Sequence, residues 1–504
     1  MKTSFQLNAS ALMVAAVLVA TQLAGCGKSV VNPVSGKTER SAMSETDEVA
    51  QGKQSHAEVM KEYTALKNPR VQAYVNDLGQ RLAKQSQRPN LVWTFTVLDS
   101  PEINAFALPG GYVYVTRGIM AYMESEADLA GVIGHEIGHV TARHGAQRAT
   151  RQQNAGFGVL AASVLGAVLE AKGVGGAGQL LGGAAQNAAA GYVAKYGREQ
   201  ELQADGLGAE YLSRINFDPR NMVDVITALK NQERFAADQA KADGRPAPAQ
   251  NSWLASHPSN DQRLAEITKL SAQFKSNVPY QDEARARYLQ MMDGVGFGES
   301  ADQGLTRGRN FYHEGLGIAI TALPNWRIQN EADKITLIDP ERDAGLVIQL
   351  VPANAGATHD EIIRNLIKPD SGKTERAQYN GLNATRFAGT QTDKAGQRKN
   401  IDLTVVTGPS NNFLMIHAAK DAATLQRNRP QMLEIESTFR ALTAADRIAA
   451  KPWTLKMVGY PKGGFAELAR LSPLPNAEQQ LRLLNGVYGG GEPKVGQAVK
   501  VAVQ

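Results

Sequence analysis

The sequence LAGVIGHEIGHVTARH, residues 129–144, restricts the fold of this chain more than any other stretch. Its apolar residues recur with the period of an α-helix, on which residues i and i+4 lie one above the other. Such a helix places His135 and His139 on one face. Ser125-Glu126-Ala127-Asp128 predicts a capping box at the start of the helix, and His144-Gly145 is its expected end.

Two imidazoles on one helical face can bind the same metal ion. Glu136, one position along, can then reach a water molecule on that ion without occupying a ligand position itself. Nitrogen ligands together with one general base are typical of zinc hydrolases. We therefore predict a hydrolytic zinc site at His135 and His139. The alternative is a surface helix with two incidental histidines.

A catalytic zinc site needs a third protein ligand, with the fourth position left for water. His144 follows His139 by five residues, which places it about 140° round the helix and off the ligand face. Gly145 stands where the metzincin pattern requires a histidine. The third ligand is therefore expected from another part of the chain.

Glu201 is the favoured third ligand. It begins an E-x-x-x-D pattern on a separate predicted helix, and Asp205 follows one turn later on the same face. Glu201 can bind the metal while Asp205 accepts a hydrogen bond from the other ring nitrogen of a ligand histidine and so sets its tautomer. Glu199 is a rival ligand whose face lacks the paired aspartate. The alternative is that both carboxylates are surface charges.

The overall composition excludes some classes of function. At 504 residues the chain is too long for a single core, so about two to four domains are expected. Apolar residues make up 43% and charged residues 20%, which is ordinary for a globular protein. The net charge of +5 is spread along the chain, with no basic stripe interleaved with aromatic residues. We therefore expect no nucleic-acid partner.

The N-terminus has the pattern of a secretory signal. Lys2 precedes an apolar run over residues 11–20, about half the ~20 residues that cross a bilayer. The ending Leu23-Ala24-Gly25-Cys26 resembles the bacterial lipoprotein box, which implies removal of residues 1–25 and acylation of Cys26. The alternative is an ordinary signal followed by a free thiol.

The residues after Cys26 bear on the compartment. Gly27 stands where an aspartate would signal retention, so the resemblance favours the periplasmic side of the outer membrane. Polar residues with Pro33 and Gly36 predict a flexible tether over residues 26–46. Cys26 is the single cysteine, so no disulfide is expected even though this compartment is oxidising.

A β-hairpin is predicted just before the metal helix. Two runs, residues 104–108 and 112–116, flank the turn Pro109-Gly110-Gly111, whose glycines are free to take positive φ. Its first strand can offer an edge to an extended peptide, which makes three residues candidates for substrate binding: Asn104, Ala105 and Phe106. The alternative is that the hairpin is only a scaffold.

Residues 156–190 are rich in glycine and alanine and nearly free of charge. Glu170-Ala171-Lys172 and Gly175-Gly176 interrupt the segment, so a membrane-spanning helix is not expected. We expect a mobile cover over the active site. The alternative is a pair of permanently buried short helices.

A glycine-rich stretch at residues 294–300 marks a boundary, after which residues 305–445 follow a β-β-β-α-β-β-β-α pattern. This pattern is typical of an α+β domain with a mostly antiparallel sheet. The turn Leu323-Pro324-Asn325-Trp326 resembles that of small PsbP-like α+β domains. The expected strands are 318–322, 335–339, 346–351, 383–388, 401–406 and 413–418.

The tail, residues 450–504, is expected to fold as βααβ. It resembles the peptidoglycan-binding LysM module in this layout and in Leu484-Asn485-Gly486 and Gly496-Gln497. It departs from that module at Pro461-Lys462-Gly463-Gly464, where Gly-Asp-Thr is usual. The resemblance implies peptidoglycan as a partner; the alternative is a module related in shape only.

Several motifs occur in a familiar order: NAFALPGG at residues 104–111, Thr116-Arg117-Gly118, HEIGH, ARH, and Arg198 with EQELQAD. Together they resemble the HtpX/CAAX-prenyl-protease zinc metallopeptidases, in the soluble periplasmic lipoprotein branch of BepA and LoiP type. The match covers about residues 47–270. It implies a mainly α zincin-type (gluzincin) domain with one Zn²⁺, held by His135, His139 and Glu201, and Glu136 as general base.

The same resemblance extends to His257-Pro258 and Arg263, because in relatives this histidine approaches the metal. Three roles remain open for His257: stabilising the oxyanion, binding zinc as a fourth ligand that silences the resting enzyme, or capping a helix. Beyond Met292 there is no tetratricopeptide periodicity, so partners that such repeats dock are not implied.

These observations predict a multidomain chain: a signal (1–25), a tether (26–46), a peptidase domain (47–292), an α+β domain (305–445) and a LysM-like domain (450–504). The expected function is a lipid-anchored zinc metalloendopeptidase of the periplasm that cleaves unfolded or misassembled envelope proteins. One alternative is an outer-membrane assembly chaperone or docking factor with latent proteolysis. Another is a cell-wall anchoring protein that acts through its tail.

Overall fold

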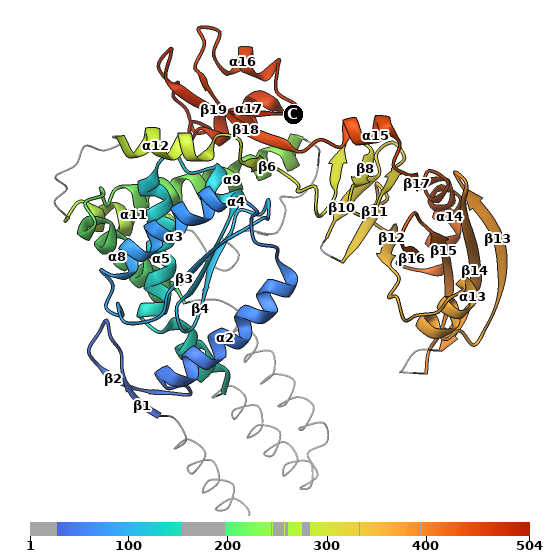
Figure 1. The fold of residues 1–504 in the computed structure, drawn as a ribbon, viewed down its shortest axis with the longest axis horizontal. Coiled ribbons are helices and arrows are strands. Elements are labelled where there is room, and N and C mark those ends of the chain that lie inside the picture. The colour runs from blue at the N-terminus through green and yellow to red at the C-terminus, as the bar shows by residue number, and fades with distance from the viewer. Residues whose placement is uncertain are drawn as a thin grey trace, which may run out of the picture. The chain divides into compact units, whose positions relative to one another are not determined.

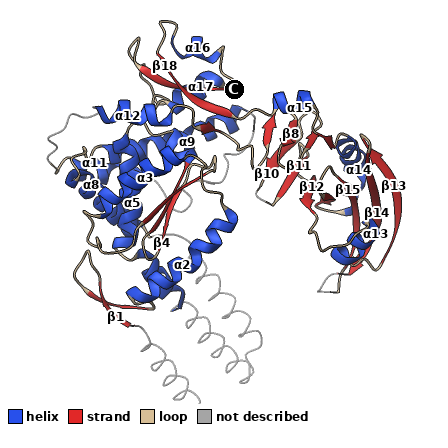
Figure 2. Cartoon of the chain, viewed as in Figure 1, coloured by secondary structure: helices blue, strands red, loops and turns tan. Residues whose placement is uncertain are grey.

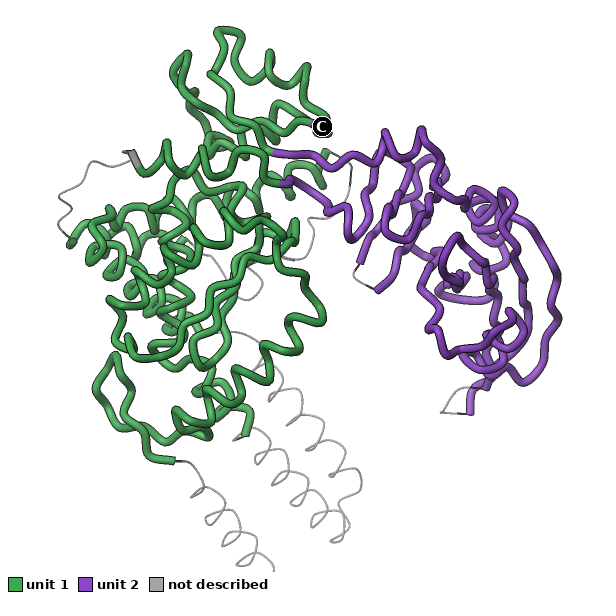
Figure 3. Tube along the Cα trace, viewed as in Figure 1, with its two compact units in different colours: residues 1–295, 455–503 green, residues 296–454, 504 purple. Residues whose placement is uncertain are grey.

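The structure is a computed structural model (Figures 1 and 2) that divides into two compact units (Figure 3). Unit 1 comprises residues 1–295 and 455–503, and unit 2 comprises residues 296–454 with Gln504. The predictions for Cys26 and residues 156–190 concern positions outside the described residues, which are 28–153, 197–242, 244, 257, 261–274, 283–331, 333–392 and 396–504.

A short hairpin precedes the helices of unit 1. β1 (Lys28–Val31) pairs with β2 (Thr38–Ser41) in antiparallel register. In the turn between them, Asn32 donates a side-chain hydrogen bond to the carbonyl of Ala142 at 3.1 Å. The prediction of a flexible tether over residues 26–46 is therefore wrong for this hairpin, because backbone pairing and the Asn32 contact hold it against the helical core.

The predicted hairpin near the metal helix is confirmed within a three-stranded sheet of order β3-β5-β4. β5 (Tyr112–Thr116) lies in the middle, parallel to β3 (Thr94–Leu98) and antiparallel to β4 (Ala105–Leu108). Gly110 and Gly111 form the turn with φ of +83° and +100°, values that a side chain would strain. β4 is therefore an edge strand in the described part of this sheet.

Helices make up most of unit 1 and surround one central member (Figure 2). Local signals begin several of them: Ser44 caps the first, and Asn68 caps the second ahead of a proline in the first turn. In chain order they are α2 (Glu45–Glu62), α3 (Pro69–Ala83), α4 (Arg117–Ala121), α5 (Glu126–Thr141), α8 (Arg198–Arg214), α9 (Asn221–Ala242), α11 (Asp261–Ser271) and α12 (Glu283–Met292).

α5 is the central helix: all its residues are buried, and it contacts α3, α8, α9, α12 and β4 (Figure 1). The capping box between Ser125 and Asp128 is confirmed. The helix ends at Thr141 and not at the predicted His144-Gly145, because Arg143 takes a left-handed conformation with φ of 60°. A new helical segment starts at His144.

The tail has the predicted order of elements: β18 (Trp453–Gly459), α16 (Gly464–Ala469), α17 (Ala477–Leu484) and β19 (Ala498–Val503). Within unit 1 it is fastened to the helical core by Lys500, whose side chain is 0% exposed. The Lys500 ammonium donates hydrogen bonds to the carbonyls of Ala121 and Met123 at 2.8 and 2.6 Å.

Two sheets lie wholly within the described residues of unit 2. The largest has seven antiparallel strands in the order β10-β11-β12-β16-β15-β14-β13, and α14 (Ala422–Ser437) packs on its main core. A four-stranded sheet has the order β17-β9-β8-β7. The strands of these two sheets are β7 (Leu305–Arg307), β8 (Asn310–His313), β9 (Ile318–Thr321), β10 (Arg327–Asn330), β11 (Lys334–Ile338), β12 (Ala344–Leu350), β13 (Ser371–Tyr379), β14 (Leu382–Thr392), β15 (Arg398–Thr407), β16 (Asn412–Ala419) and β17 (Arg440–Ala441).

The predicted pattern for this region was incomplete. It lacks two edge strands of the large sheet, β10 and β13, and three strands of the four-stranded sheet, β7, β8 and β17. The first predicted strand, now β9, belongs to the four-stranded sheet. The reason for β13 is physical: eight of its nine residues, 371–378, are exposed or half-buried, so they show no apolar alternation. The third predicted strand is followed by helix α13 (His359–Ile362) and a short π-helix (Ile363–Ile367).

Among the described residues, no helix is both long and apolar enough to cross a membrane.

Candidate metal centre

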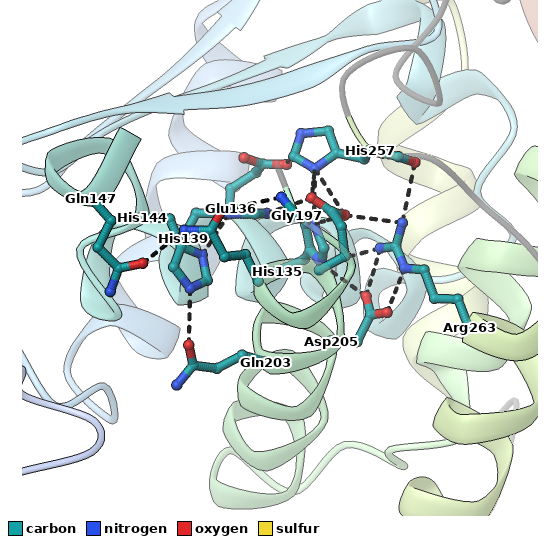
Figure 4. Close-up of polar contacts among 12 residues, drawn as sticks. His135, Glu136, His139, His144, Gln147, Gly197, Gln203, Asp205, His257 and Arg263 are labelled. Carbon is teal, nitrogen blue, oxygen red and sulfur yellow. Dashed lines mark hydrogen bonds and ion pairs between the residues drawn. The ribbon is translucent and has the colours of Figure 1, made fainter. Parts of the chain in front are cut away.

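The two predicted ligand histidines of α5 (Figure 4) converge with Glu201 of α8. Nε2 of His139 lies 3.0 Å from Nε2 of His135, so both rings point the same nitrogen at one place. The Glu201 carboxylate lies 3.6 Å from each of these nitrogens and is 2% exposed. The rival ligand Glu199 is exposed on the same helix and does not join them.

Small residues let the two helices approach this closely. A Cβ built on Gly138 would lie 3.1 Å from the carbonyl oxygen of Ala204, and one built on Gly134 would lie 3.3 Å from the Cα of Gly208. Larger side chains at these positions would push the helix axes apart. Gly134 and Gly138 therefore help to bring Glu201 within reach of the histidines.

Asp205 holds His135, in the arrangement expected from the E-x-x-x-D spacing. Its carboxylate lies 2.9 Å from Nδ1 of His135, which leaves Nε2 of that ring for the ligand cluster. Arg263 binds both carboxylates: its guanidinium contacts Asp205 at 2.5 and 2.7 Å and Glu201 at 3.1 Å. Arg263 is buried at 2% exposure, so the ion pairs position both side chains in a dry interior.

His257 enters the cluster from a distant segment. Its Nδ1 lies 3.1 Å from Glu201 and 3.3 Å from Nε2 of His135. On the other side of the ring, Nε2 lies 3.7 Å from the carboxylate of Glu136. His257 therefore stands between the general-base candidate and the ligand set, and its backbone carbonyl accepts a hydrogen bond from Arg263 at 3.2 Å.

The charges of the cluster depend on burial and on each other. Burial and the nearby His135 hold the pKa of His139 well below its usual value, so this imidazole is neutral and can act as a ligand. Burial would lower the pKa of His257, but the carboxylates of Glu136 and Glu201 outweigh it and raise that pKa. Burial would raise the pKa of Glu201, but the nearby His257 outweighs this effect, so that pKa lies below its usual value.

His144 is a neighbour of the site whose contact sequence reasoning missed. It lies off the ligand cluster, as predicted, but its Nδ1 is 2.9 Å from Nδ1 of His139 and its Nε2 is 2.9 Å from Oε1 of Gln203 (Figure 4). Burial lowers the pKa of His144 to about 4. The ARH triplet in the family motif was the signal that could have pointed to it.

The candidate substrate residues lie at the start of β4. The backbone N–H of Asn104 bonds to Thr116 at 3.2 Å, while its side-chain Oδ1 is buried and meets no hydrogen-bond donor in the described part of the chain. A crevice of about 10 Å³, lined by Leu108 and His139 among others, runs between the end of β4 and α5.

The donor set fits a zinc ion. One atom from each of four buried residues lies within 4.8 Å of the other three: His135, His139, Glu201 and His257. Imidazole nitrogen and carboxylate oxygen in a set of this size are the ligands that Zn²⁺ takes with tetrahedral geometry. The structure thus brings together every metal-site residue predicted from the sequence.

Comparisons with known proteins agree with this site. Residues 69–271 match the model of peptidase family M48. Over 231 residues the chain is 31% identical to the beta-barrel assembly-enhancing protease of Escherichia coli (strain K12), covering 45% of each chain. Over 212 residues it is 29% identical to the mitochondrial metalloendopeptidase OMA1 of Arabidopsis thaliana, covering 42% of this chain and 37% of that one.

The chain spans less than half the length of these curated relatives. Among solved structures, cyanobacterial PsbP from Synechocystis sp. PCC 6803 matches at 11% identity and a TM-score of 0.21, covering 29% of this chain and 98% of that one, a likeness too weak to support an argument. The family match covers both helices of the metal cluster, α5 and α8. The stretch that matches the model of peptidase family M48, residues 69–271, therefore contains His135, His139, Glu201 and His257.

Proposed function

We propose that this chain is a zinc-dependent metalloendopeptidase that cleaves unfolded or misassembled proteins of the bacterial envelope. The observation that carries the proposal is the convergence of His135, His139 and Glu201 beside Glu136 inside a peptidase family M48 domain. Relatives that are named for β-barrel assembly support an envelope substrate.

The roles of the residues follow from their positions. Zinc held by His135, His139 and Glu201 would supply Lewis acidity to the scissile carbonyl and the attacking water. Glu136 accepts a proton from that water and returns it to the leaving amine. Because Glu136 is 1% exposed, bulk water does not compete for this proton. Asp205 orients His135 during these steps through the bond to its Nδ1.

We propose that an extended substrate pairs with the free edge of β4. An edge strand offers backbone N–H and C=O groups that an added strand can satisfy. The unpartnered Oδ1 of Asn104 supports this assignment, since a peptide N–H is the donor that it lacks. Ala105 and Phe106 follow on the same strand and would contact the next substrate residues.

Of the three roles left open for His257, the geometry supports the fourth-ligand latch. The ring lies inside the ligand cluster, with Nδ1 3.1 Å from Glu201, and it is 1% exposed. A fourth protein ligand takes the place that a catalytic zinc site keeps for water. The resting enzyme is therefore latent, and activation requires His257 to leave the cluster.

Two variants test this function. Glu136→Gln should abolish casein cleavage while the protein retains one zinc, measured by metal analysis, because amide oxygen is a poor base. His257→Ala should raise cleavage above wild type if His257 is a latch. Loss of cleavage on His257→Ala would instead assign the oxyanion role. Cleavage by Glu136→Gln at the wild-type rate would refute the peptidase mechanism.

A second candidate function rests on the closed state of the site. With four protein ligands together, the chain would act mainly as an assembly chaperone or docking factor, with proteolysis rare. The Glu136→Gln variant separates the two functions in cells. If it rescues the envelope defects of a deletion strain as well as wild type does, binding is the main activity.

The cellular setting is part of the same proposal. The sequence pattern at Cys26 supports a lipid anchor on the periplasmic side of the outer membrane, with domains at 47–292, 305–445 and 450–504. The βααβ order of the tail supports a LysM-like peptidoglycan module. Its α17–β19 loop packs on α9 through Tyr488 and Asp238, which are 2.7 Å apart, so glycan contact would use the opposite side. A pulldown with purified peptidoglycan tests this assignment.

A further inference from the structure

The two ligand histidines are held by different partners. A histidine that binds a metal through Nε2 must carry its hydrogen on Nδ1, and a hydrogen-bond acceptor at Nδ1 fixes that tautomer. For His135 the acceptor is the carboxylate of Asp205 at 2.9 Å. For His139 the facing atom is Nδ1 of a second imidazole, His144, also at 2.9 Å.

The direction of the His139–His144 hydrogen bond follows from a third residue. Nε2 of His144 lies 2.9 Å from Oε1 of Gln203, and an amide oxygen can only accept. Nε2 of His144 must therefore carry the hydrogen. In neutral His144, Nδ1 then carries no hydrogen and acts as a hydrogen-bond acceptor. The hydrogen in the His139–His144 hydrogen bond is therefore on Nδ1 of His139. The lone pair of His139 is left on Nε2, which faces the ligand cluster.

The backbone is built to place His144 at this point. His144 would lie off the ligand face of a continuous helix, but α5 stops at Thr141 and Arg143 reverses the chain with φ of 60°. This unusual conformation is held by an ion pair to Glu48 at 2.5 Å and a hydrogen bond to the carbonyl of Met43 at 2.8 Å. A non-glycine residue with positive φ persists only where its surroundings stabilise it.

We propose that Gln203, His144 and His139 form a tautomer relay, in which Gln203 and His144 are positioning residues that keep Nε2 of His139 available to the metal. The inference rests on the proposed function, since that function assigns His139 to zinc. It also gives α8 two roles: α8 supplies the ligand Glu201 and, two residues later, the acceptor that ends the relay. The competing explanation is a buried polar pair that only stabilises the fold.

The test compares variants that keep or remove one acceptor. In His144→Asn, the side-chain oxygen can take the place of Nδ1 and accept from His139; in His144→Leu, no acceptor remains. Gln203→Met removes the acceptor that fixes the tautomer of His144, and it is compared with wild type. Zinc affinity is measured for each by competition with a chelator, and the tautomer of His139 is read in the zinc-free full chain by nitrogen NMR of labelled histidine.

The relay predicts that His144→Leu loses about 10- to 100-fold in zinc affinity, that His144→Asn recovers most of it, and that His139 changes tautomer only in the variant without an acceptor. Equal losses in both His144 variants, or an unchanged tautomer in His144→Leu, would overturn it. If the His144 variants fail to fold, Gln203→Met compared with wild type tests the same hydrogen bonds: the relay predicts weaker zinc binding and a mixture of His139 tautomers, and no change in either would overturn it. If wild type binds no zinc, the proposed function fails, while the tautomer of His139 still decides the relay.

Discussion

Gly138→Ala tests whether close packing of α5 on α8 sets the metal centre. The new Cβ would lie 3.1 Å from the carbonyl oxygen and 3.2 Å from the Cα of Ala204, and 3.2 Å from the Cβ of Leu207. Carbon atoms prefer a separation of about 3.5–4.0 Å. These atoms belong to the α8 backbone or are fixed to it, so relief requires the helix itself to move by a few tenths of an ångström, together with Glu201.

The effects on stability and on function should differ. Alanine in place of a helical glycine stabilises by ~1 kcal/mol, while overpacking costs ~1–3 kcal/mol, so the free energy of unfolding should change by only about 0–2 kcal/mol. Misplacement by 1 Å can cost about 100-fold in activity, so a shift of a few tenths should lower zinc affinity and casein cleavage roughly tenfold.

Gly131→Ala is a matched control on the same helix. Its Cβ would meet Met222 Sδ at 3.1 Å and Val225 Cγ2 at 3.3 Å, which are side-chain atoms of α9 and not backbone atoms of α8. Gly131→Ala should raise the free energy of unfolding slightly and keep zinc affinity within about twofold of wild type. Urea unfolding, chelator competition and casein cleavage are measured for both variants. If the two have the same zinc affinity and activity, the packing argument is refuted.

Three further predictions concern the surroundings of the site. Asp205→Ala removes the acceptor for His135, so zinc affinity should fall about 10- to 100-fold. It also removes one of the two carboxylates that pair with the buried Arg263, so the free energy of unfolding should fall by ~1–3 kcal/mol; unchanged chelator competition would count against this role. Lys500→Met leaves two buried carbonyls without a hydrogen-bond donor, so the free energy of unfolding, measured in urea, should fall by ~2–4 kcal/mol. The exposed control Lys456→Met should change the free energy of unfolding by less than ~0.5 kcal/mol. Removing zinc with a chelator should lower the thermal midpoint, because an ion at 100 times its Kd stabilises by ~2.7 kcal/mol; a midpoint that does not respond to zinc would contradict a bound ion.

Much of the metal centre could be predicted from the sequence because its signals are local. The capping box at Ser125 and the i, i+4 pairs on α5 and α8 depend on helix geometry within one or two turns. The same helix geometry predicted that His144 is not one of the ligands, and His144 lies outside the ligand cluster. The tail order β-α-α-β and six strands of unit 2, β9, β11, β12, β14, β15 and β16, also follow from short-range periodicity.

Other features leave no local signal. β13 was missed because an edge strand exposed to solvent has no apolar alternation, and the hairpin at residues 28–41 was read as a tether because its residues are polar. The contact of His144 with His139 arises from a left-handed Arg143, a conformation that arginine rarely adopts without support from elsewhere in the fold.

By itself, the sequence determined which residues on each helix share a face, and therefore that His135 with His139 and Glu201 with Asp205 act as pairs. Only the tertiary structure decided that these two faces meet, that His257 enters between them, and that His144 turns back onto His139. The reason is physical: helix periodicity orients neighbours along the chain, whereas the distance between two helices is set by side-chain volumes packed between them, such as the missing Cβ of Gly138.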